Sequence, residues 1–547
     1  MPTKSLLINY NDCPSSIDSL MPDNGLASLA GSLLAAGHKT QILDYATIQT
    51  LRDFRPGKIR NRLKIAYLRY KIENRFFGKM SERTYEIFRN IDDDINRCRD
   101  KKIREIIDEI AGKVRSEKLD FVAFKLWSGE GFLGSVKIAE GLRSTFPQLK
   151  IFAGGPHCEI YGERTFSFTN AFDVLCQSEG EETIVQLADF AGGAGQLADI
   201  PNIIYKDGTA TKTTPLKFIS DLNDMAEAVY DEAVYPAMKD GKKLKIIMME
   251  ESRGCPYSCN FCIHRIKSGN KWRLRNVDKV VNTIEALSHK LNTRAFRFSG
   301  SNTPYFYRNE LAKRLIDKNL NIKYVGFSDT RQPESEDYDL LRRSGCVSLF
   351  FGMESADPYL LEHMINKNTS VEWIRDSLTR ARKAGILTSA SIIVPCPGET
   401  EESLEKTVDL LLETKPYGVS VYPAVCYPKT KWLAESTRFG FDIDENFEEK
   451  MMTFTIKFTM PPPMLTPLPF KVDGKDFYAM VEEILKISKR LEAAGITTSL
   501  NDSLLMIGDV LKLSPPKVKK LNQTGMILGN CEELSKKIAA FNSAVKL

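Results

Sequence analysis

The sequence predicts an α/β protein with two parallel-sheet units in succession and a mainly helical C-terminal region. Short apolar runs alternate with helical stretches over residues 1–200, and the alternation resumes over residues 246–435. Strands that alternate with helices are typical of parallel sheets. Residues 436–547 lose this rhythm and have the pattern of amphipathic helices. A chain of 547 residues is long enough for several such domains.

Composition excludes several classes of protein. Hydrophobic residues make up 42% of the chain and charged residues 27%, with a formal net charge of +5, so no general affinity for nucleic acid is expected. The apolar runs are shorter than a membrane span and the N-terminus lacks the features of a signal peptide, so we expect a cytoplasmic protein without a transmembrane segment. In that compartment cysteines rarely form disulfides. Of the eleven cysteines, only Cys255, Cys259 and Cys262 form a cluster.

Residues 1–200 are expected to form a doubly wound, Rossmann-like domain. An apolar run, "SLLINY", precedes a helical stretch over 26–36, and Gly37 suits the end of that helix. Further strands are supplied by "TQILDY", "LDFVAFKLWS", "QLKIFAGGPH" and "AFDVLCQ", with helical sequence between them.

An insertion over about 47–117 interrupts this domain. Part of it, "KIRNRLKIAYLRYKIENRFFGKM", is strongly basic with interleaved aromatic residues. One interpretation is a solvated helical elaboration that packs its apolar side chains on the domain. The other is a surface for an anionic substrate, a lipid or nucleic acid. Both fit the sequence.

Residues 201–245 have the pattern of a connector with a small hairpin, because "KDG" supplies an Asp-Gly turn. Residues 246–435 then carry six strand-like runs, each followed by helical sequence: "KLKIIMMEES", "AFRFSGS", "IKYVGFSD", "SLFFGMES", "TSASIIVP" and "GVSVYPAV". Six strands in this rhythm predict a partial (β/α)6 barrel of the TIM type, whose ligands bind at the carboxyl ends of the strands.

Residues 436–547 are expected to form a helical substrate-binding or cap region. The stretch "TMPPPMLTPLPF" is a proline-rich link that cannot lie inside a helix. It is followed by "GKDFYAMVEEILKISKRLEAAG", whose apolar residues recur with helical spacing.

The first barrel strand runs into "SRGCPYSCNFC", residues 252–262, which places three cysteines on one tight loop. A structural zinc site normally has four ligands, and His264 is too close to Cys262 in sequence to complete the tetrahedron. A 4Fe–4S cluster that is held by three cysteines keeps one iron open. The spacing therefore favours an iron–sulfur cluster whose open iron binds a reactant.

At this loop the chain resembles the radical S-adenosylmethionine (SAM) superfamily, whose signature is CxxxCxxC with an aromatic residue before the last cysteine. The resemblance implies that Cys255, Cys259 and Cys262 ligate the cluster and that SAM chelates the open iron. Reduction by an electron donor such as flavodoxin or ferredoxin would cleave SAM to a 5′-deoxyadenosyl radical. The protein's own tasks are then positioning and the exclusion of competing reactions.

Four later segments resemble the SAM-binding motifs of this family, in order. In "RFSGSNTPYF", Ser299 and Ser301 would support the SAM amino group. In "FGMES", Glu354 and Ser355 would approach the ribose or methionine part, and in "SIIVPCPGETEES", Ile393 would lie near adenine. The sixth-strand segment, "YPAVCYPKTKW", has a lysine where glycine is common. A structural ion pair is the alternative interpretation of the glutamate.

The doubly wound domain resembles that of the cobalamin-binding subfamily through "GLASLAGSLLAAGHKTQILD", "IFAGGPH" and "FDVLCQSEGEETI". The resemblance implies that Gly154 and Gly155 let the backbone approach the nucleotide tail of cobalamin. The same rim would include four residues of the next loop: Ser178, Glu179, Gly180 and Glu181. A tight turn alone is the alternative for Gly-Gly-Pro. The Asp-x-His-x-x-Gly motif is absent, so cobalamin would bind without a protein imidazole, or the domain has lost the cofactor.

The resemblance implies a cobalamin-dependent radical SAM enzyme, foremost a methyltransferase that acts on an unactivated carbon or a phosphorus centre. The alternatives are cyclisation, rearrangement or oxidation with the same two cofactors, and a radical SAM enzyme with a vestigial cobalamin domain. No residue is assigned as a catalytic acid or base. The substrate can be a small molecule, a lipid or a peptide. Two further cysteines near predicted strand ends, Cys396 and Cys426, are interpreted as packing residues.

Overall fold

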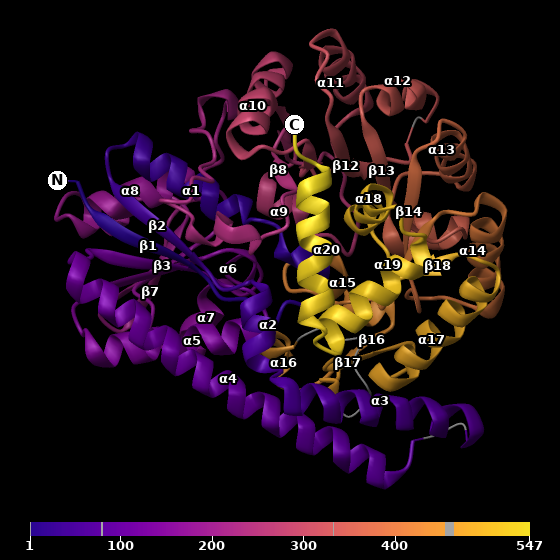
Figure 1. Cartoon of the computed structure of the whole chain (residues 1–547), viewed down its shortest axis with the longest axis horizontal. Helices are drawn as coiled ribbons and strands as arrows, with labels where there is room; N and C mark the ends of the chain where they lie inside the picture. Colours follow the sequence, from indigo (N-terminus) through magenta and orange to yellow (C-terminus); the bar gives the residue numbers. More distant parts are fainter. Residues whose placement is uncertain (1, 78–79, 332, 455–463) are drawn as a thin grey trace.

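The computed structural model describes residues 2–77, 80–331, 333–454 and 464–547. Within these ranges two seven-stranded sheets lie side by side, and helices flank both (Figure 1). The predicted α/β class is confirmed, with a doubly wound unit, a partial barrel and a mainly helical C-terminal region. No helix of the described chain is long and apolar enough to span a bilayer.

The first sheet has the strand order β2-β1-β3-β4-β5-β6-β7 in the described chain. Its strands are β1 (Lys4–Asn9), β2 (Lys39–Asp44), β3 (Phe121–Lys125), β4 (Lys150–Gly154), β5 (Val174–Cys176), β6 (Ile203–Asp207) and β7 (Ala210–Thr213). The first five are parallel, and the order reverses between β1 and β3, at the switch point where such sheets hold ligands. The sequence predicts the hairpin β6–β7 within a connector. In the structure β6 pairs antiparallel with β5, so the hairpin extends the first sheet and supplies hydrogen-bond partners for the open edge of β5.

Helices cover both faces of this sheet. They are α1 (Asn24–Ala35), α5 (Glu130–Thr145), α6 (Pro156–Tyr161), α7 (Thr165–Phe168) and α8 (Glu181–Ala191). α1 and α8 lie on one face and α5 on the other (Figure 1). Gly37 adopts a φ of +86° just after α1, and the amide of His38 bonds the carbonyl of Leu33, so the helix ends where the sequence predicts.

The insertion is helical: α2 (Ile48–Phe54), α3 (Gly57–Phe77) and α4 (Glu82–Glu117). α4 packs on α5, and Ile103, Ile106 and Ile110 of α4 belong to the main hydrophobic core. α3 and α4 form a pair with a small core of their own, which includes Leu63 and Phe88. This pair runs along the lower side of the molecule in Figure 1 and reaches from the first sheet to the C-terminal helices.

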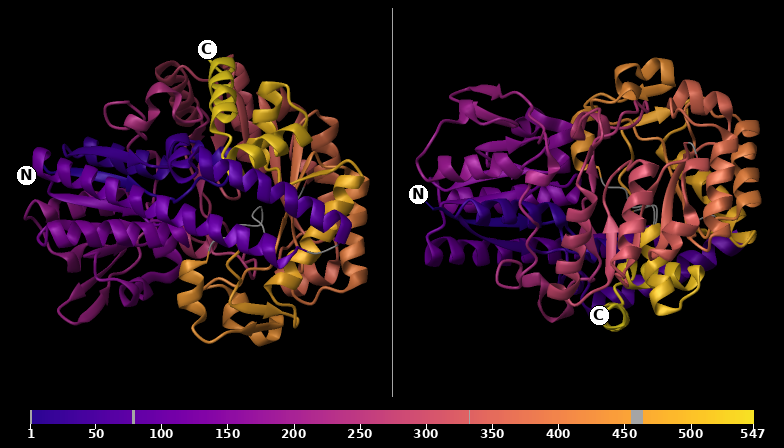
Figure 2. Two further views of the ribbon diagram at one scale, coloured as in Figure 1. Left: turned by 60° about the horizontal axis from the view of Figure 1, so that its bottom comes forward. Right: turned by 90° about the horizontal axis from the view of Figure 1, so that it is seen from above.

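The second sheet is parallel throughout and has the order β18-β15-β14-β13-β12-β11-β8 in the described residues. Its strands are β8 (Ile247–Met249), β11 (Ala295–Phe298), β12 (Lys323–Ser328), β13 (Cys346–Glu354), β14 (Leu387–Ile393), β15 (Gly418–Tyr422) and β18 (Thr497–Thr498). The helices outside it are α10 (Val277–Leu291), α11 (Tyr305–Asp317), α12 (Tyr338–Arg343), α13 (Val371–Lys383) and α14 (Glu401–Thr414). The sequence predicts the first six strands but not β18, which is too short to show a period. The curved arrangement is visible in the right view of Figure 2.

The C-terminal region closes the amino ends of these strands through α18 (Asp502–Leu511), which packs against β12, β13 and β14. The region is preceded by α15 (Lys431–Ala434) and contains β16 (Phe441–Ile443), α16 (Phe447–Thr453), β17 (Phe470–Val472), α17 (Phe477–Ala493), α18, α19 (Pro515–Asn522) and α20 (Cys531–Ala544). Leu504 of α18 lies in one buried cluster with Ala295 and Val325, at the starts of β11 and β12. The carboxyl ends are therefore left for the site. The proline run of the predicted link, 461–463, lies outside the described residues.

Candidate active site

The cysteine loop begins in a short antiparallel ribbon of β9 (Ser252–Arg253) and β10 (Arg273–Leu274), and it continues into α9 (His264–Ser268). Gly254 has a φ of +86°, and a Cβ there would lie 2.0 Å from the carbonyl oxygen of Lys271. Only glycine fits this close approach. The Gly before the first cysteine is thus a geometric requirement of the loop.

The other end of the loop is tied to the segment after β13. The backbone amide of Asn260 donates to the carbonyl of Ile365 at 2.8 Å, and its side chain donates to the carbonyl of Met364 at 3.0 Å. The indole of Trp432 donates to the same Met364 carbonyl at 2.8 Å, and Phe261 packs on its ring with centroids 5.6 Å apart. The aromatic residue before the last cysteine therefore anchors the loop.

The three thiols are free, and their surroundings suit cluster ligands. The amide of Asn302 lies 3.5 Å from the sulfur of Cys255, and the backbone amide of His264 lies 3.4 Å from that of Cys262. Such N–H groups stabilise thiolates and tune clusters. Burial raises the pKa of Cys262 to about 11 and also raises the pKa of Cys259, so metal binding must offset this cost.

A single ion fits the loop less well than a cluster. No group of three or more His, Cys, Asp or Glu side chains in the described chain is arranged to hold one metal ion. In a cubane each thiolate ligates a different iron, so the sulfurs need not converge on one point. The donor set is therefore suited to a 4Fe–4S cluster with an open iron.

The turn after β11 carries Ser299 and Ser301. Glu251, at the end of the first barrel strand, accepts hydrogen bonds from the backbone amides of Ser299 and Gly300, both at 3.2 Å, and from the hydroxyl of Thr303 at 2.5 Å. Burial raises the pKa of the Glu251 carboxyl despite these bonds. The hydroxyl of Ser301 lies 3.0 Å from Nδ1 of His264, so the structure brings this turn against the cysteine loop.

Glu354 lies at the carboxyl end of β13, with a φ of +65°. Its carboxylate accepts from Nζ of Lys367 at 2.9 Å and from the hydroxyl of Ser391 at 3.1 Å. Lys367 is buried, and its charge also acts on Cys259, so this pair borders the cysteine loop. Ser355 is turned away toward α14, where its hydroxyl meets that of Thr407 at 3.3 Å.

Four further residues of the sequence analysis lie in or beside the barrel. Ile393 is buried at the carboxyl end of β14 and pairs with Tyr422 of β15. Cys396 and Cys426 are fully buried, in keeping with packing residues. The lysine that replaces glycine, Lys429, keeps a positive φ of 69°, and its Nζ donates to the carbonyl of Glu159 in the first domain at 2.6 Å.

A cavity of about 520 Å³ lies between the carboxyl ends of the two sheets. It is lined by eight of the predicted site residues: Gly154, Gly155, Ser178, Glu179, Gly180, Glu181, Ser299 and Ser301. Glu354, Ser355, Ile393 and the three cysteines are not part of its lining. The structure thus brings the rim of the doubly wound domain and the Ser299–Ser301 turn to one space.

The side chains of the rim are already engaged. Glu179 accepts from Arg273 at 2.6 Å, and Glu181 accepts from Arg253 at 2.5 Å. The hydroxyl of Ser178 donates to a backbone carbonyl of α9 at 3.2 Å. These contacts hold the cysteine loop against the rim. The rim's contribution to ligand binding would therefore come from its backbone and from the glycines beside it.

Other lining residues escaped the sequence analysis. Lys125 ends β3, pairs with Asp23 at 2.5 Å and lies 4.5 Å over the ring of Trp127. Lys125 and Trp127 lie at the end of the predicted strand "LDFVAFKLWS", so the strand-end rule could have found them. Lys367, which pairs with Glu354 and does not line this cavity, follows the π-helical turn η7 (Leu360–Ile365) and has no such signal.

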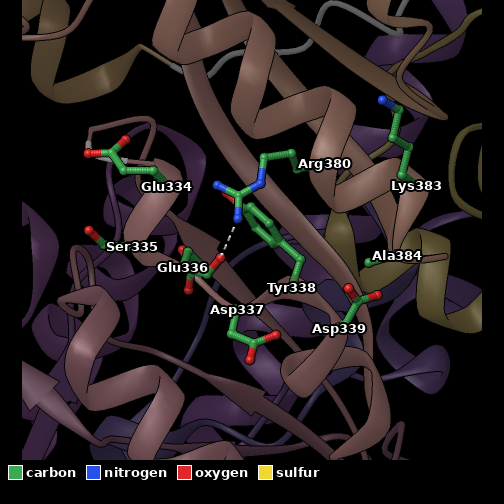
Figure 3. A pocket seen from close by; sticks show the side chains of 9 residues that line it. All are labelled: Glu334, Ser335, Glu336, Asp337, Tyr338, Asp339, Arg380, Lys383 and Ala384. Carbon is green, nitrogen blue, oxygen red and sulfur yellow. Dashed lines mark hydrogen bonds between the residues drawn. The ribbon is translucent and has the colours of Figure 1, made fainter.

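A second cavity, of about 510 Å³, lies on the helix-covered side of the barrel between α12 and α13 (Figure 3). Arg380 reaches across it to the backbone carbonyl of Glu336 at 3.2 Å. None of the predicted site residues lines this cavity, so we do not assign it to the reaction.

The cysteine loop follows the first strand of a parallel partial barrel, and the doubly wound domain lies on the other side of the cavity. This combination of fold and cysteine loop is that of a barrel protein suited to an iron–sulfur cluster. Residues 249–411 match the family model described as the radical SAM superfamily, so the chain carries a radical SAM domain. This family implies a 4Fe–4S cluster and SAM as cofactors.

Individual proteins extend this comparison. An uncharacterized methyltransferase of Pyrococcus horikoshii is 29% identical over 47% of this chain and 56% of its own length. The anaerobic magnesium-protoporphyrin IX monomethyl ester cyclase of Rubrivivax gelatinosus is 26% identical over 49% of this chain and 50% of its own length. The chain thus spans about half the length of these curated relatives.

A solved structure matches the whole chain. The radical SAM methyltransferase TsrM from Kitasatospora setae, solved with cobalamin and a [4Fe-4S] cluster bound, superposes with a TM-score of 0.66 at 14% identity. The match covers 98% of this chain and 99% of that one. At this identity the likeness concerns the fold.

Proposed function

We propose that the chain is a cobalamin-dependent radical SAM enzyme that transfers a methyl group to an unactivated carbon or a phosphorus centre. The observation that carries the proposal is the cavity between the two sheets. It joins the glycine rim of the doubly wound domain to the Ser299–Ser301 turn beside the cysteine loop. A cobalt carrier and a SAM molecule can meet in such a space.

Each residue then has a stated task. Cys255, Cys259 and Cys262 would hold the cluster, and Ser299, Ser301, Glu354 and Ile393 would lie along the path of SAM. The hydroxyl of Ser355 is turned away from this path, toward Thr407. Gly154, Gly155 and the Ser178–Glu181 rim would admit cobalamin. When bound, the cluster and SAM would supply an adenosyl radical, and cobalamin would supply the methyl group. The chain itself orients these groups and excludes water.

The lining of the cavity supports cobalamin binding without a protein imidazole. The one histidine among the described lining residues is His264, which belongs to the cysteine loop and bonds Ser301. The carboxyl ends of β1 and β4 instead present Asn9, Asn11 and the glycine pair. This is the arrangement that the missing Asp-x-His-x-x-Gly motif predicts.

Cyclisation is the second candidate, because one relative is a magnesium-protoporphyrin monomethyl ester cyclase. The two candidates share the cofactors and differ in the fate of the substrate radical. Product analysis with methyl-labelled SAM separates them, since only a methyltransferase moves the label into product.

The testing experiment is anaerobic reconstitution with iron, sulfide, a reductant and hydroxocobalamin, followed by metal analysis and the visible spectrum. We expect about four irons and about one cobalt per chain. Cys255→Ala should lose iron, and Gly154→Val should lose cobalt by narrowing the cavity while iron is retained. Gly112→Val, where nothing lies within 4 Å of the new side chain, is the control. Iron without cobalt in the wild-type chain would remove the cobalamin mechanism and leave a SAM-only enzyme.

A further inference from the structure

Helix α3 exposes an apolar stripe to solvent although its opposite face is already buried. Ile65, Leu68 and Ile72 are 70%, 60% and 47% exposed, and their spacing of three and four residues puts them on one face. The opposite face packs Ile59 and Leu63 against α4. The stripe therefore contributes nothing to the core and needs a different explanation.

Positive charge surrounds this stripe. α3 carries seven Lys or Arg residues and one Glu. Arg62 is paired with Asp94, and Arg69 is paired with the inward-turned Glu73. The remaining charge is carried mainly by lysines, among which Lys64 lies directly beside the stripe. An apolar stripe flanked by lysines is typical of a helix that lies in the surface of a lipid bilayer.

A basic groove of about 390 Å³ adjoins the stripe. It is formed where α3 meets α19 and α20, and Lys64, Lys517, Lys520 and Lys537 line it together with one acidic residue, Glu533. No acidic side chain pairs with these lysines among the described residues. Such a cluster attracts the phosphate groups of anionic lipids, each lysine contributing through the surface potential.

We propose that this surface, α3 together with the basic groove, docks the protein on a membrane that contains anionic phospholipid. The stripe enters the level of the acyl chains, and the groove receives lipid phosphates. Charge complementarity favours a bilayer over a second copy of the chain, because two such basic surfaces repel each other. The inference is independent of the proposed function, since the docking surface shares no residue with the cavity between the sheets.

The test is co-sedimentation of the full chain with vesicles of phosphatidylcholine alone or mixed with phosphatidylglycerol. We expect binding to the mixed vesicles, weakened by salt. Ile65→Ser combined with Leu68→Ser and Ile72→Ser should reduce it by at least about tenfold, because the stripe no longer inserts. Lys517→Glu combined with Lys520→Glu should weaken binding to the mixed vesicles by at least about fivefold for each substituted lysine. This double substitution should not change binding to vesicles of phosphatidylcholine alone.

Helix α17 supplies matched controls. Tyr478→Ser with Leu485→Ser removes exposed apolar side chains of similar exposure, and Lys486→Glu with Lys489→Glu reverses two exposed lysines. Neither should change vesicle binding, and all variants should keep the native circular dichroism spectrum. No binding to any vesicle, or binding that the stripe variant leaves intact, overturns the proposal. If gel filtration shows a dimer and only the stripe variant is monomeric, the stripe is an interface with a second copy of the chain instead.

Discussion

Removing the charge of Arg253 should destabilise the junction between the two sheets more than any surface change. Its side chain is only 10% exposed and contacts the carboxylates of Glu181 at 2.5 Å, Glu250 at 2.6 Å and Glu179 at 3.3 Å. Arg253→Met leaves these carboxylates close together without a counter-charge. Breaking a buried pair in this way costs about 3–5 kcal/mol. We therefore expect the free energy of unfolding to fall by about that amount in urea denaturation.

The same variant should change how stability depends on pH. Burial tends to raise the pKa of the Glu181 carboxyl, but Arg253 outweighs it and holds that pKa below its ordinary value. In the native chain this group contributes stability above its unfolded pKa, which is lost as the pH falls through the folded pKa. Without Arg253 nothing offsets burial, so the pKa of the Glu181 carboxyl rises above its unfolded value. The ionised carboxylate then destabilises the folded chain instead of stabilising it. The loss in the free energy of unfolding, relative to the wild-type chain, should be largest near neutral pH and shrink as the pH approaches about 4.3.

Two controls make the test decisive. Arg314→Met removes an arginine that is 47% exposed and pairs with Glu310 at 2.9 Å, and should cost less than about 1 kcal/mol. Adding Glu181→Gln to Arg253→Met should restore part of the stability, because it removes one uncompensated charge. A deficit below about 1 kcal/mol, or one that stays constant with pH, would refute the reasoning.

Three further predictions concern the site. Gly254→Ala should sharply lower the iron content after reconstitution, because its methyl would meet a backbone carbonyl, whereas Gly474→Ala, with a φ of +78° and nothing within 4 Å, should not. Glu354→Gln should weaken SAM binding in calorimetry; adding Lys367→Met should recover stability but not SAM affinity, and recovery of both would make Glu354 a structural partner only. Cys396→Ser should cost about 1–3 kcal/mol by burying an unpaired hydroxyl, yet leave the iron content unchanged; iron loss would contradict its assignment as a packing residue.

The architecture could be predicted because its signals are local and periodic. Each of the first six barrel strands is a mainly apolar run before a helix, which is how strands buried on both faces are recognised. The cysteine spacing is equally local. The two-residue strand β18 and the placement of hairpin β6–β7 were missed because both depend on which open sheet edge lies nearby in space.

The site was predictable only in part for the same reason. The glycine rim follows β4 and the Ser299–Ser301 turn follows β11, so the strand-end rule finds both. Sequence cannot show that the carboxylates of Glu179 and Glu181 are paired with Arg273 and Arg253, in the ribbon beside the cysteine loop. In sequence, charged residues on a rim look like ligand contacts. Their actual partners lie roughly 70 to 100 residues away along the chain, so only the structure shows that these residues form ion pairs.

The cross-domain contacts also decide where the shape of the site comes from. The cavity lies between two sheets whose carboxyl ends face each other, so neither domain alone encloses it. Its walls are held by contacts such as Lys429 to the carbonyl of Glu159 and Arg273 to Glu179. A buried charge pair such as Arg273 with Glu179 adds little net stability but penalises any other alignment, because each misplacement leaves a buried charge unpaired. The junction is therefore suited to fixing the distance between the cysteine loop and the glycine rim.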